Sequence, residues 1–266
     1  MKKACLLTIF CLLISSLALA QKKPGRSNAD VVRAAVTTCG DDPVISSDGT
    51  PVGEDFIASA TTAYYKLNVK GGHSYAIEVW APFDPTDGSS PALSLVANDC
   101  STPVSTTDVT ADDPDLSGGF SARISWIQGS DASVHVSFNN PDQNSPGYTY
   151  YVRVTDTTLF NARWSTYSGW VSYWGFTNTT ATAMTGHLTV RGLDGSIVAQ
   201  SDVSLPVNQA TYLQSNKPPL NVPAQNAGNA SFAYIGPPGA VVTDSYMVGT
   251  NGLFIPTVFA TKHSYR

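Results

Sequence analysis

Residues 63–80 read AYYKLNVKGGHSYAIEVW, and this segment decides the fold class of the chain. Apolar side chains occupy alternate positions on both sides of a Lys70-Gly71-Gly72-His73 turn: Ala63, Tyr65, Leu67 and Val69 before it, then Tyr75, Ile77 and Val79 after it. A period of two is typical of β-strands with one buried face. A glycine pair between two such runs predicts a hairpin.

The same pattern continues along the chain in both directions from this segment. Further strands are expected in the first half within 124–126, 134–138 and 150–154, and in the second half within 170–177, 187–191, 197–198, 210–213, 231–235, 240–248 and 255–261. The number and spacing of strands in the second half are close to those of an immunoglobulin-like sandwich. We therefore expect an all-β protein of two β-sandwich domains in tandem, the first jelly-roll-like and the second immunoglobulin-like.

Charge places the boundary between the two expected domains. Residues 35–156 carry a net charge of −12, whereas residues 157–266 carry +2 and the short stretch 21–34 carries +3. We predict an acidic domain over 35–156, a second domain over 157–266 and a basic, flexible arm over 21–34. The acidic first domain argues against nucleic-acid binding, because phosphates would be repelled.

The N-terminal 20 residues have the pattern of a secretory signal peptide. Lys2 and Lys3 precede an apolar run at 4–14, and Ala18-Leu19-Ala20 matches a cleavage site that leaves Gln21 as the new N-terminus. The alternative is an uncleaved membrane anchor, for which the apolar run is short. The sequence predicts export to the cell surface, the medium or the periplasm, with no membrane span in the mature chain.

The four cysteines divide between the signal peptide and the mature chain. Cys5 and Cys11 leave with the signal peptide, so Cys39 and Cys100 remain, 61 positions apart. Two cysteines in an exported chain are most simply explained by a disulfide. The alternative, metal-binding or catalytic thiols, lacks a C-x-x-C spacing or an adjacent histidine.

Two pieces of the first half have a recognisable pattern: YYKLNV at 64–69, followed by the glycine pair and YAI at 75–77, and GYTYYVRV at 147–154. They resemble the pre-peptidase C-terminal domain of secreted bacterial proteins. The resemblance covers about residues 50–156. It implies a jelly-roll-like β-sandwich that is an accessory, non-catalytic module, often implicated in substrate binding or secretion. The second half resembles bacterial immunoglobulin-like surface domains in general.

Clustered aspartates predict a calcium site in the first half. They occur in FDPTDGSS and ADDPDLSGG, and the candidate ligands are Asp84, Asp87, Asp112, Asp113 and Asp115. Calcium takes six to eight oxygen ligands, which acidic loops supply. The alternative is that these are solvated turn residues, and neither segment matches a known calcium-loop spacing.

The densest aromatic stretch is RWSTYSGWVSYWGF at residues 163–176. Exposed aromatic rings stack on sugars because they combine apolar area with a polar group. We expect most of these rings to be core, and we name Trp164, Tyr167 and Tyr173 as the candidates for exposed ligand-binding residues.

The sequence contains no recognisable catalytic motif. Its few histidines are interpreted as surface residues, because His135 and His187 fall on the polar side of their predicted strands. We therefore expect a secreted or cell-surface, non-catalytic binding module for carbohydrate or another surface ligand. One alternative is a structural subunit of a surface layer or filament that self-associates through residues 21–34. The other is a small secreted hydrolase with a cryptic site.

Overall fold

The structure is built from β-strands, so the all-β fold class is confirmed. This computed structural model describes residues 33–34, 36–57, 61–80, 92–104, 108–111, 121–139 and 148–262. They contain eighteen strands and a single short 3-10 turn, η1 (Tyr167–Gly169). No helix in these ranges has the length and apolar character needed to cross a bilayer.

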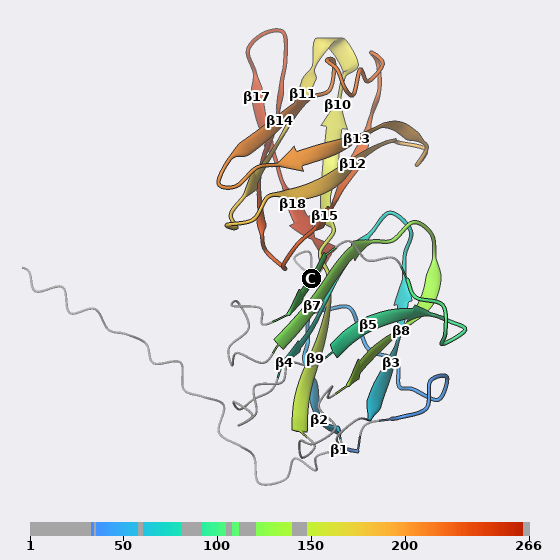
Figure 1. The fold of residues 1–266 in the computed structure, drawn as a ribbon. Coiled ribbons are helices and arrows are strands. Elements are labelled where there is room, and N and C mark those ends of the chain that lie inside the picture. Colours follow the sequence, from blue (N-terminus) through green and yellow to red (C-terminus); the bar gives the residue numbers. More distant parts are fainter. Residues whose placement is uncertain are drawn as a thin grey trace, which may run out of the picture. The chain divides into compact units, whose positions relative to one another are not determined.

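Two sheets form from the first half of the chain (Figure 1). One has six strands in the order β1 (Arg33–Ala34), β2 (Val52–Ile57), β9 (Tyr148–Asp156), β4 (Ser74–Trp80), β7 (Ser121–Ile127) and β6 (Asp108–Ala111). The other has three strands in the order β3 (Thr62–Val69), β8 (Ala132–Asn139) and β5 (Ala92–Ala97). Arg33 and Ala34, the last residues of the predicted basic arm, form β1 and pair in parallel with β2.

The predicted hairpin at residues 70–73 is wrong, although both of its strands exist. β3 pairs with β8, whereas β4 pairs with β7 and β9 in the other sheet. The chain therefore crosses between sheets at Gly71-Gly72. Two strands with alternating apolar residues can bury them against each other across a sandwich as well as side by side, and local sequence does not separate these cases. Gly72 has a φ of +76°, which favours glycine.

Two further sheets form from the second half. One has the order β13 (Ile197–Leu205), β12 (Met184–Gly192), β15 (Ala227–Ile235), β10 (Leu159–Ser165) and β18 (Phe259–Thr261). The other has the order β14 (Ala210–Gln214), β11 (Val171–Asn178), β16 (Val241–Val248) and β17 (Phe254–Thr257). All of their pairings are antiparallel, so one face of each sheet can be apolar and the other polar.

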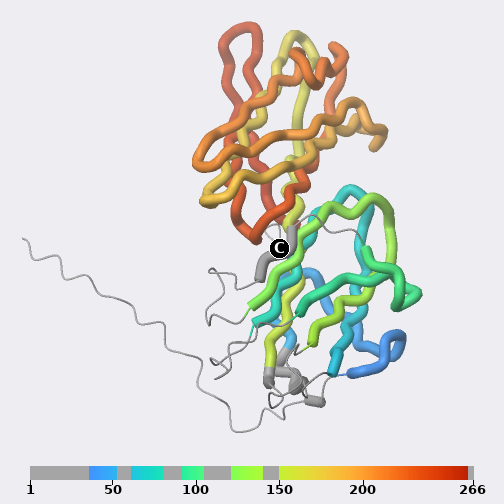
Figure 2. Tube along the Cα trace, viewed as in Figure 1, coloured from blue at the N-terminus to red at the C-terminus, as the bar shows by residue number. Residues whose placement is uncertain are grey.

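The buried hydrophobic side chains form two clusters. Each comes from one continuous stretch of chain, whose path Figure 2 shows from blue to green for the first and from yellow to red for the second. The first draws on residues between Ile45 and Val154, and the second on residues between Leu159 and Phe259. In the second, Phe176 of β11 stacks on Phe232 of β15 with ring centroids 3.8 Å apart, which joins the two sheets. The separate cores agree with the charge boundary near 156, and the tandem arrangement of two domains stays a prediction.

Candidate functional site

A row of aromatic side chains crosses the outer face of the sheet β14-β11-β16-β17. Its members, called the aromatic strip below, are Tyr212, Tyr173, Tyr246 and Phe254, one from each strand. Along β11 the side chains of Trp174 and Phe176 are buried, so Tyr173 lies on the opposite, outer face. Tyr246 is its direct partner on β16, and Phe254 of β17 lies opposite Val248, two residues along β16 from Tyr246. The register therefore places all four rings on one outer face.

The rings of the aromatic strip contact one another. Tyr173 and Tyr246 are stacked, with centroids 4.9 Å apart and planes 17° from parallel. The centroids of Tyr246 and Phe254 are also 4.9 Å apart, with a tilt of 31°. Such cross-strand aromatic pairs stabilise a sheet. Tyr212 and Phe254 are 54% and 55% exposed, so the two ends of the aromatic strip are more open than its centre.

Glycine at position 175 makes room for the ring of Tyr212. The two residues are direct partners on β11 and β14. A Cβ atom added to Gly175 would lie 2.6 Å from a ring carbon of Tyr212 and 2.8 Å from the carbonyl oxygen of Asp244. The phenol ring therefore lies over the bare backbone of β11. A glycine within a strand is otherwise unfavourable, and close approach of another group is a usual reason for it.

The outer face around the aromatic strip is almost uncharged. Among the outward-facing residues of these four described strands, Asp244 alone carries a charge; the others are Val171, Tyr173, Gly175, Thr177, Ala210, Tyr212, Gln214, Val242, Tyr246, Val248, Phe254 and Pro256. Partial burial and then the neighbouring Tyr173, Asp244 and Tyr212 raise the pKa of Tyr246. Its hydroxyl therefore stays protonated at neutral pH and can donate a hydrogen bond.

The three ligand-binding candidates from the sequence have different positions in the structure. Tyr173 lies in the aromatic strip. Tyr167 is 44% exposed on the η1 turn, beside a shallow pocket of about 510 Å³ that Arg163, Trp170 and Leu193 also line. The expectation that Trp164 is exposed is wrong: its side chain is wholly buried, and its Nε1 donates to the carbonyl oxygens of β12 and β15.

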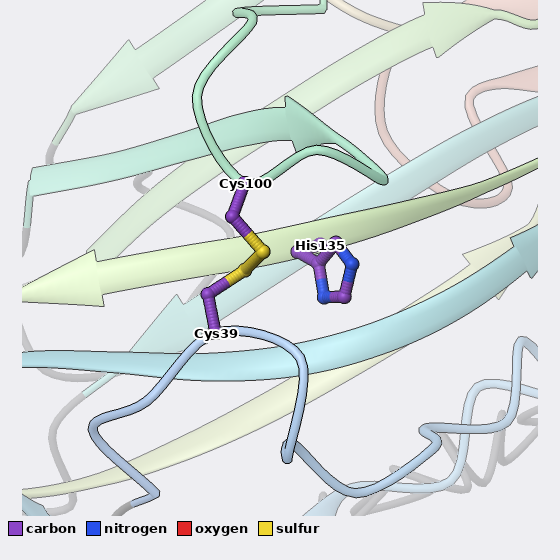
Figure 3. Close-up of side chains that lie close together, drawn as sticks. All are labelled: Cys39, Cys100 and His135. Atoms are coloured by element: carbon purple, nitrogen blue, oxygen red, sulfur yellow. A yellow bond between two sulfur atoms is a disulfide. The ribbon is translucent and has the colours of Figure 1, made fainter.

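The predicted disulfide between Cys39 and Cys100 is present. Pro43 and Ile45 pair with Lys66 of β3, so the segment that carries Cys39 runs along one edge of the sheet β3-β8-β5. Cys100 follows β5 at the other edge. The bridge thus spans the central strand β8, and His135 of that strand lies beside it (Figure 3). Both sulfurs are bonded to each other, so neither offers the thiolate that a zinc ion needs.

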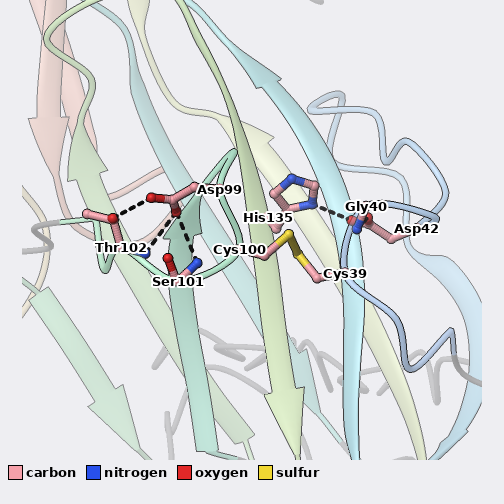
Figure 4. The surroundings of a disulfide bond; sticks show 8 residues. All are labelled: Cys39, Gly40, Asp42, Asp99, Cys100, Ser101, Thr102 and His135. Carbon is pink, nitrogen blue, oxygen red and sulfur yellow. Dashed lines mark hydrogen bonds and ion pairs between the residues drawn. A yellow bond between two sulfur atoms is a disulfide. The ribbon is translucent and has the colours of Figure 1, made fainter.

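His135 is buried, so the expectation of a surface histidine is wrong for this residue. It lies on the outer face of its sheet, but the segment around the disulfide covers it and leaves it 1% exposed. Its Nδ1 lies 2.7 Å from a carboxylate oxygen of Asp42, whose side chain is also fully buried (Figure 4). The backbone N–H of Gly40 donates to the other oxygen at 2.8 Å. Periodicity could not have shown this, because the covering segment is distant in sequence.

The buried pair makes stability depend on pH. Burial opposes ionisation of Asp42, but the hydrogen bonds from His135 and Gly40 outweigh it and lower the pKa of this carboxyl below its usual value. A carboxyl with a lowered pKa in the folded state contributes stability above its unfolded pKa of about 4, and this stability is lost as the pH falls through the folded pKa.

Replacing Asp42 by Asn should lower the free energy of unfolding at pH 7 by about 2 kcal/mol, since a buried hydrogen bond to a charged group is lost. Urea unfolding between pH 2 and 7 should also show a weaker fall in stability below about pH 4 than in the wild type. Asp202→Asn is the matched control, because His187–Asp202 is the same kind of pair at 2.7 Å but 93% of the Asp202 side chain is exposed. An equal effect of both substitutions would contradict a special role for the buried pair.

The candidate calcium ligands Asp84, Asp87, Asp112, Asp113 and Asp115 lie outside the described residues, as does the predicted signal peptide. The calcium site therefore stays a prediction.

Comparison with known proteins adds little to the geometry. No protein-family model matches the chain, and no curated protein matches it, so the resemblance to the pre-peptidase C-terminal domain stays a prediction. Among solved structures, the chain is similar to a glycosyl hydrolase family 2 (GH2) member from Bacteroides cellulosilyticus, at 11% identity and a TM-score of 0.20. The match covers 75% of this chain and 26% of the other, so the chain spans about a quarter of that protein.

Proposed function

We propose that this protein is a non-catalytic carbohydrate-binding module whose ligand lies on the aromatic strip. The observation that carries the proposal is the alignment of four aromatic side chains on the outer face of one sheet, two of them more than half exposed. Aromatic rings in such positions offer apolar area to the C–H groups of a sugar, and the tyrosine hydroxyls offer hydrogen bonds.

The structure of the sheet supports recognition without large rearrangement. Three of its four strands, β11, β14 and β16, bury side chains on the opposite face, so the rings of Tyr173, Tyr212 and Tyr246 are held before any ligand arrives. A site that is ordered before binding loses less conformational entropy on association. The hydrophobic core does not require aromatic rings on the outer face, because side chains on the inner faces of the same strands fill it. A binding role does require them there.

We further propose that the protein acts outside the cytoplasm. The signal-peptide pattern of residues 1–20 supports export, and the Cys39–Cys100 disulfide is of the kind that persists in oxidising compartments. We also propose that the aspartate-rich segments of the first half bind calcium, since their carboxylates are the oxygen ligands that this ion takes.

A glycan array tests the proposed function directly. The chain from Gln21 onward, the predicted mature form, should bind a subset of glycans, and Tyr246→Ala should weaken that binding about fivefold through the loss of a ring contact worth about 1 kcal/mol. Ile197→Ala is the control, because Ile197 is 52% exposed on β13, a strand of the other sheet of the second half.

Running the array with calcium and again with EDTA separates the two predicted sites. Binding that disappears in EDTA would support a calcium requirement, and binding that persists would assign recognition to the aromatic strip alone. Failure to bind any glycan under both conditions would overturn the proposed function and would favour the structural-subunit alternative.

A further inference from the structure

We infer that the aromatic strip takes a linear, uncharged glycan that lies across the four strands from β14 to β17, with one sugar on Tyr212 and another on Phe254. This inference rests on the proposed function and adds the length, direction and charge of the ligand.

The open ring surfaces lie at the two ends of the aromatic strip. Tyr173 and Tyr246 overlap, because two nearly parallel rings with centroids 4.9 Å apart cannot lie side by side in one plane. Each therefore covers part of the other's face and presents mainly its edge and hydroxyl. Tyr212 and Phe254, at 54% and 55% exposure, keep the most accessible surface.

The ring of Tyr212 is held in place for stacking. It lies over Gly175, where the absence of a Cβ lets the phenol approach the backbone. The backbone of β11 supports the ring from below, and its exposed surface is available to a ligand. The ring of Tyr246 supports Phe254 on one side, with the two ring centroids 4.9 Å apart.

The distance between the two ends sets a minimum length for the ligand. Tyr212 and Phe254 stand on the two edge strands of a four-stranded sheet, so three strand spacings separate them. At about 4.8 Å per spacing, the separation across the sheet is about 14 Å, and the full distance is longer because Tyr212 is level with Gly175 and Phe254 with Val171 on β11. A single sugar ring cannot contact both ends, whereas a short linear chain can, with its middle sugars over the hydroxyls of Tyr173 and Tyr246.

The charge of this face favours a neutral ligand. Asp244, the single charged outward residue of these strands, pairs with Gly175 and is therefore next to the ring of Tyr212. No Lys or Arg accompanies it on the outward face of these described strands. A glycan with carboxylates or sulfates would meet repulsion without a compensating cation, whereas a neutral sugar could donate a hydroxyl to the Asp244 carboxylate.

The test compares ligands of different length on the full mature chain. Isothermal titration calorimetry would use mono-, di-, tetra- and hexasaccharides of linear β-linked glucose, mannose, xylose and N-acetylglucosamine, with oligogalacturonates of the same lengths as the charged counterparts. For the neutral series that binds best, the tetrasaccharide should bind at least about tenfold more tightly than the disaccharide, with little further gain for the hexasaccharide.

Substitutions at the two ends make the test specific. Tyr212→Ala and Phe254→Ala should each remove most of the advantage of the tetrasaccharide over the disaccharide, while Ile197→Ala should leave it intact. Urea unfolding of each variant confirms that the fold is retained. Gly175→Ala tests the support of Tyr212 in a second way, and should weaken the tetrasaccharide more than the disaccharide.

Three results would overturn the inference while leaving the proposed function in place. They are affinity that does not depend on length, oligogalacturonates that bind as well as neutral chains, and end substitutions that change all lengths equally. Absence of binding to any glycan on the array would instead overturn the proposed function itself, and would point to a protein partner for this face.

Discussion

Replacing Trp164 by Ala should lower the free energy of unfolding by about 3–5 kcal/mol, the usual range for removing a large aromatic side chain from a core. Trp164 is wholly buried in the second hydrophobic cluster. Its Nε1 donates to the carbonyl oxygens of Arg191 and Asn229 at 3.0 and 2.9 Å, so the substitution also removes the donor that these oxygens share. Urea denaturation followed by fluorescence or circular dichroism would measure the loss.

Two further variants separate packing from hydrogen bonding at this position. Trp164→Phe keeps part of the ring volume but removes the N–H, and should cost about 1–3 kcal/mol. Tyr167→Ala, three residues along and 44% exposed, should have a much smaller effect. If Trp164→Ala and Tyr167→Ala destabilised the protein equally, the burial of Trp164 in the core would be contradicted.

The misplacement of Trp164 from sequence has a structural reason. The expected strand begins at residue 170 and leaves Trp164 before it, whereas residues 159–165 form a strand of their own, β10. Leu159 and Asn161 are buried in alternation, and then the register shifts between Asn161 and Trp164. A β-bulge of this kind inserts an unpaired residue and changes which positions face the core. A period of two cannot place side chains across such an irregularity.

Many of the strands could be predicted because they carry a pattern of their own, whereas β1, β2, β5, β6 and β10 lie outside the strands expected from the sequence. Segments such as 63–69, 75–79, 134–138 and 150–154 alternate strictly, and the structure has β3, β4, β8 and β9 there. The partners could not be predicted, as the strands on either side of Gly71-Gly72 show. Pairing depends on contacts between segments far apart in the chain, and no local property of a strand records which neighbour it has.

The same limit explains why only one member of the aromatic strip was found from sequence. Tyr173 belongs to a dense aromatic stretch and was a candidate. Tyr212, Tyr246 and Phe254 occur in separate segments with no local sign of function, and they meet Tyr173 through the order β14-β11-β16-β17. The alternation of Val242, Asp244, Tyr246 and Val248 does show that Tyr246 shares a face with a charged residue. That alternation could have predicted an outward-facing ring at Tyr246.

Removing the disulfide by the double substitution Cys39→Ala and Cys100→Ala should lower the free energy of unfolding by about 4 kcal/mol, since the bridge closes a loop over a sequence separation of 61. The chain-entropy argument assigns this effect to the unfolded state, which gains freedom when the cross-link is absent. A second effect is local: the segment near Cys39 holds Asp42 against His135, and without the bridge this buried pair should open more often.

Two measurements distinguish these effects. Urea unfolding with and without a reducing agent should show the wild type losing stability on reduction, while the double variant stays unchanged. Hydrogen exchange should show the largest loss of protection at the residues that the disulfide segment contacts, including the N–H groups of Ile45 and Lys66, which bond to Lys66 and Pro43 in the folded chain. A loss of less than about 1 kcal/mol would mean that the unfolded chain already keeps residues 39 and 100 close together. Uniform exchange across the first half would show that the bridge acts on global stability and does not hold the Asp42–His135 pair in particular.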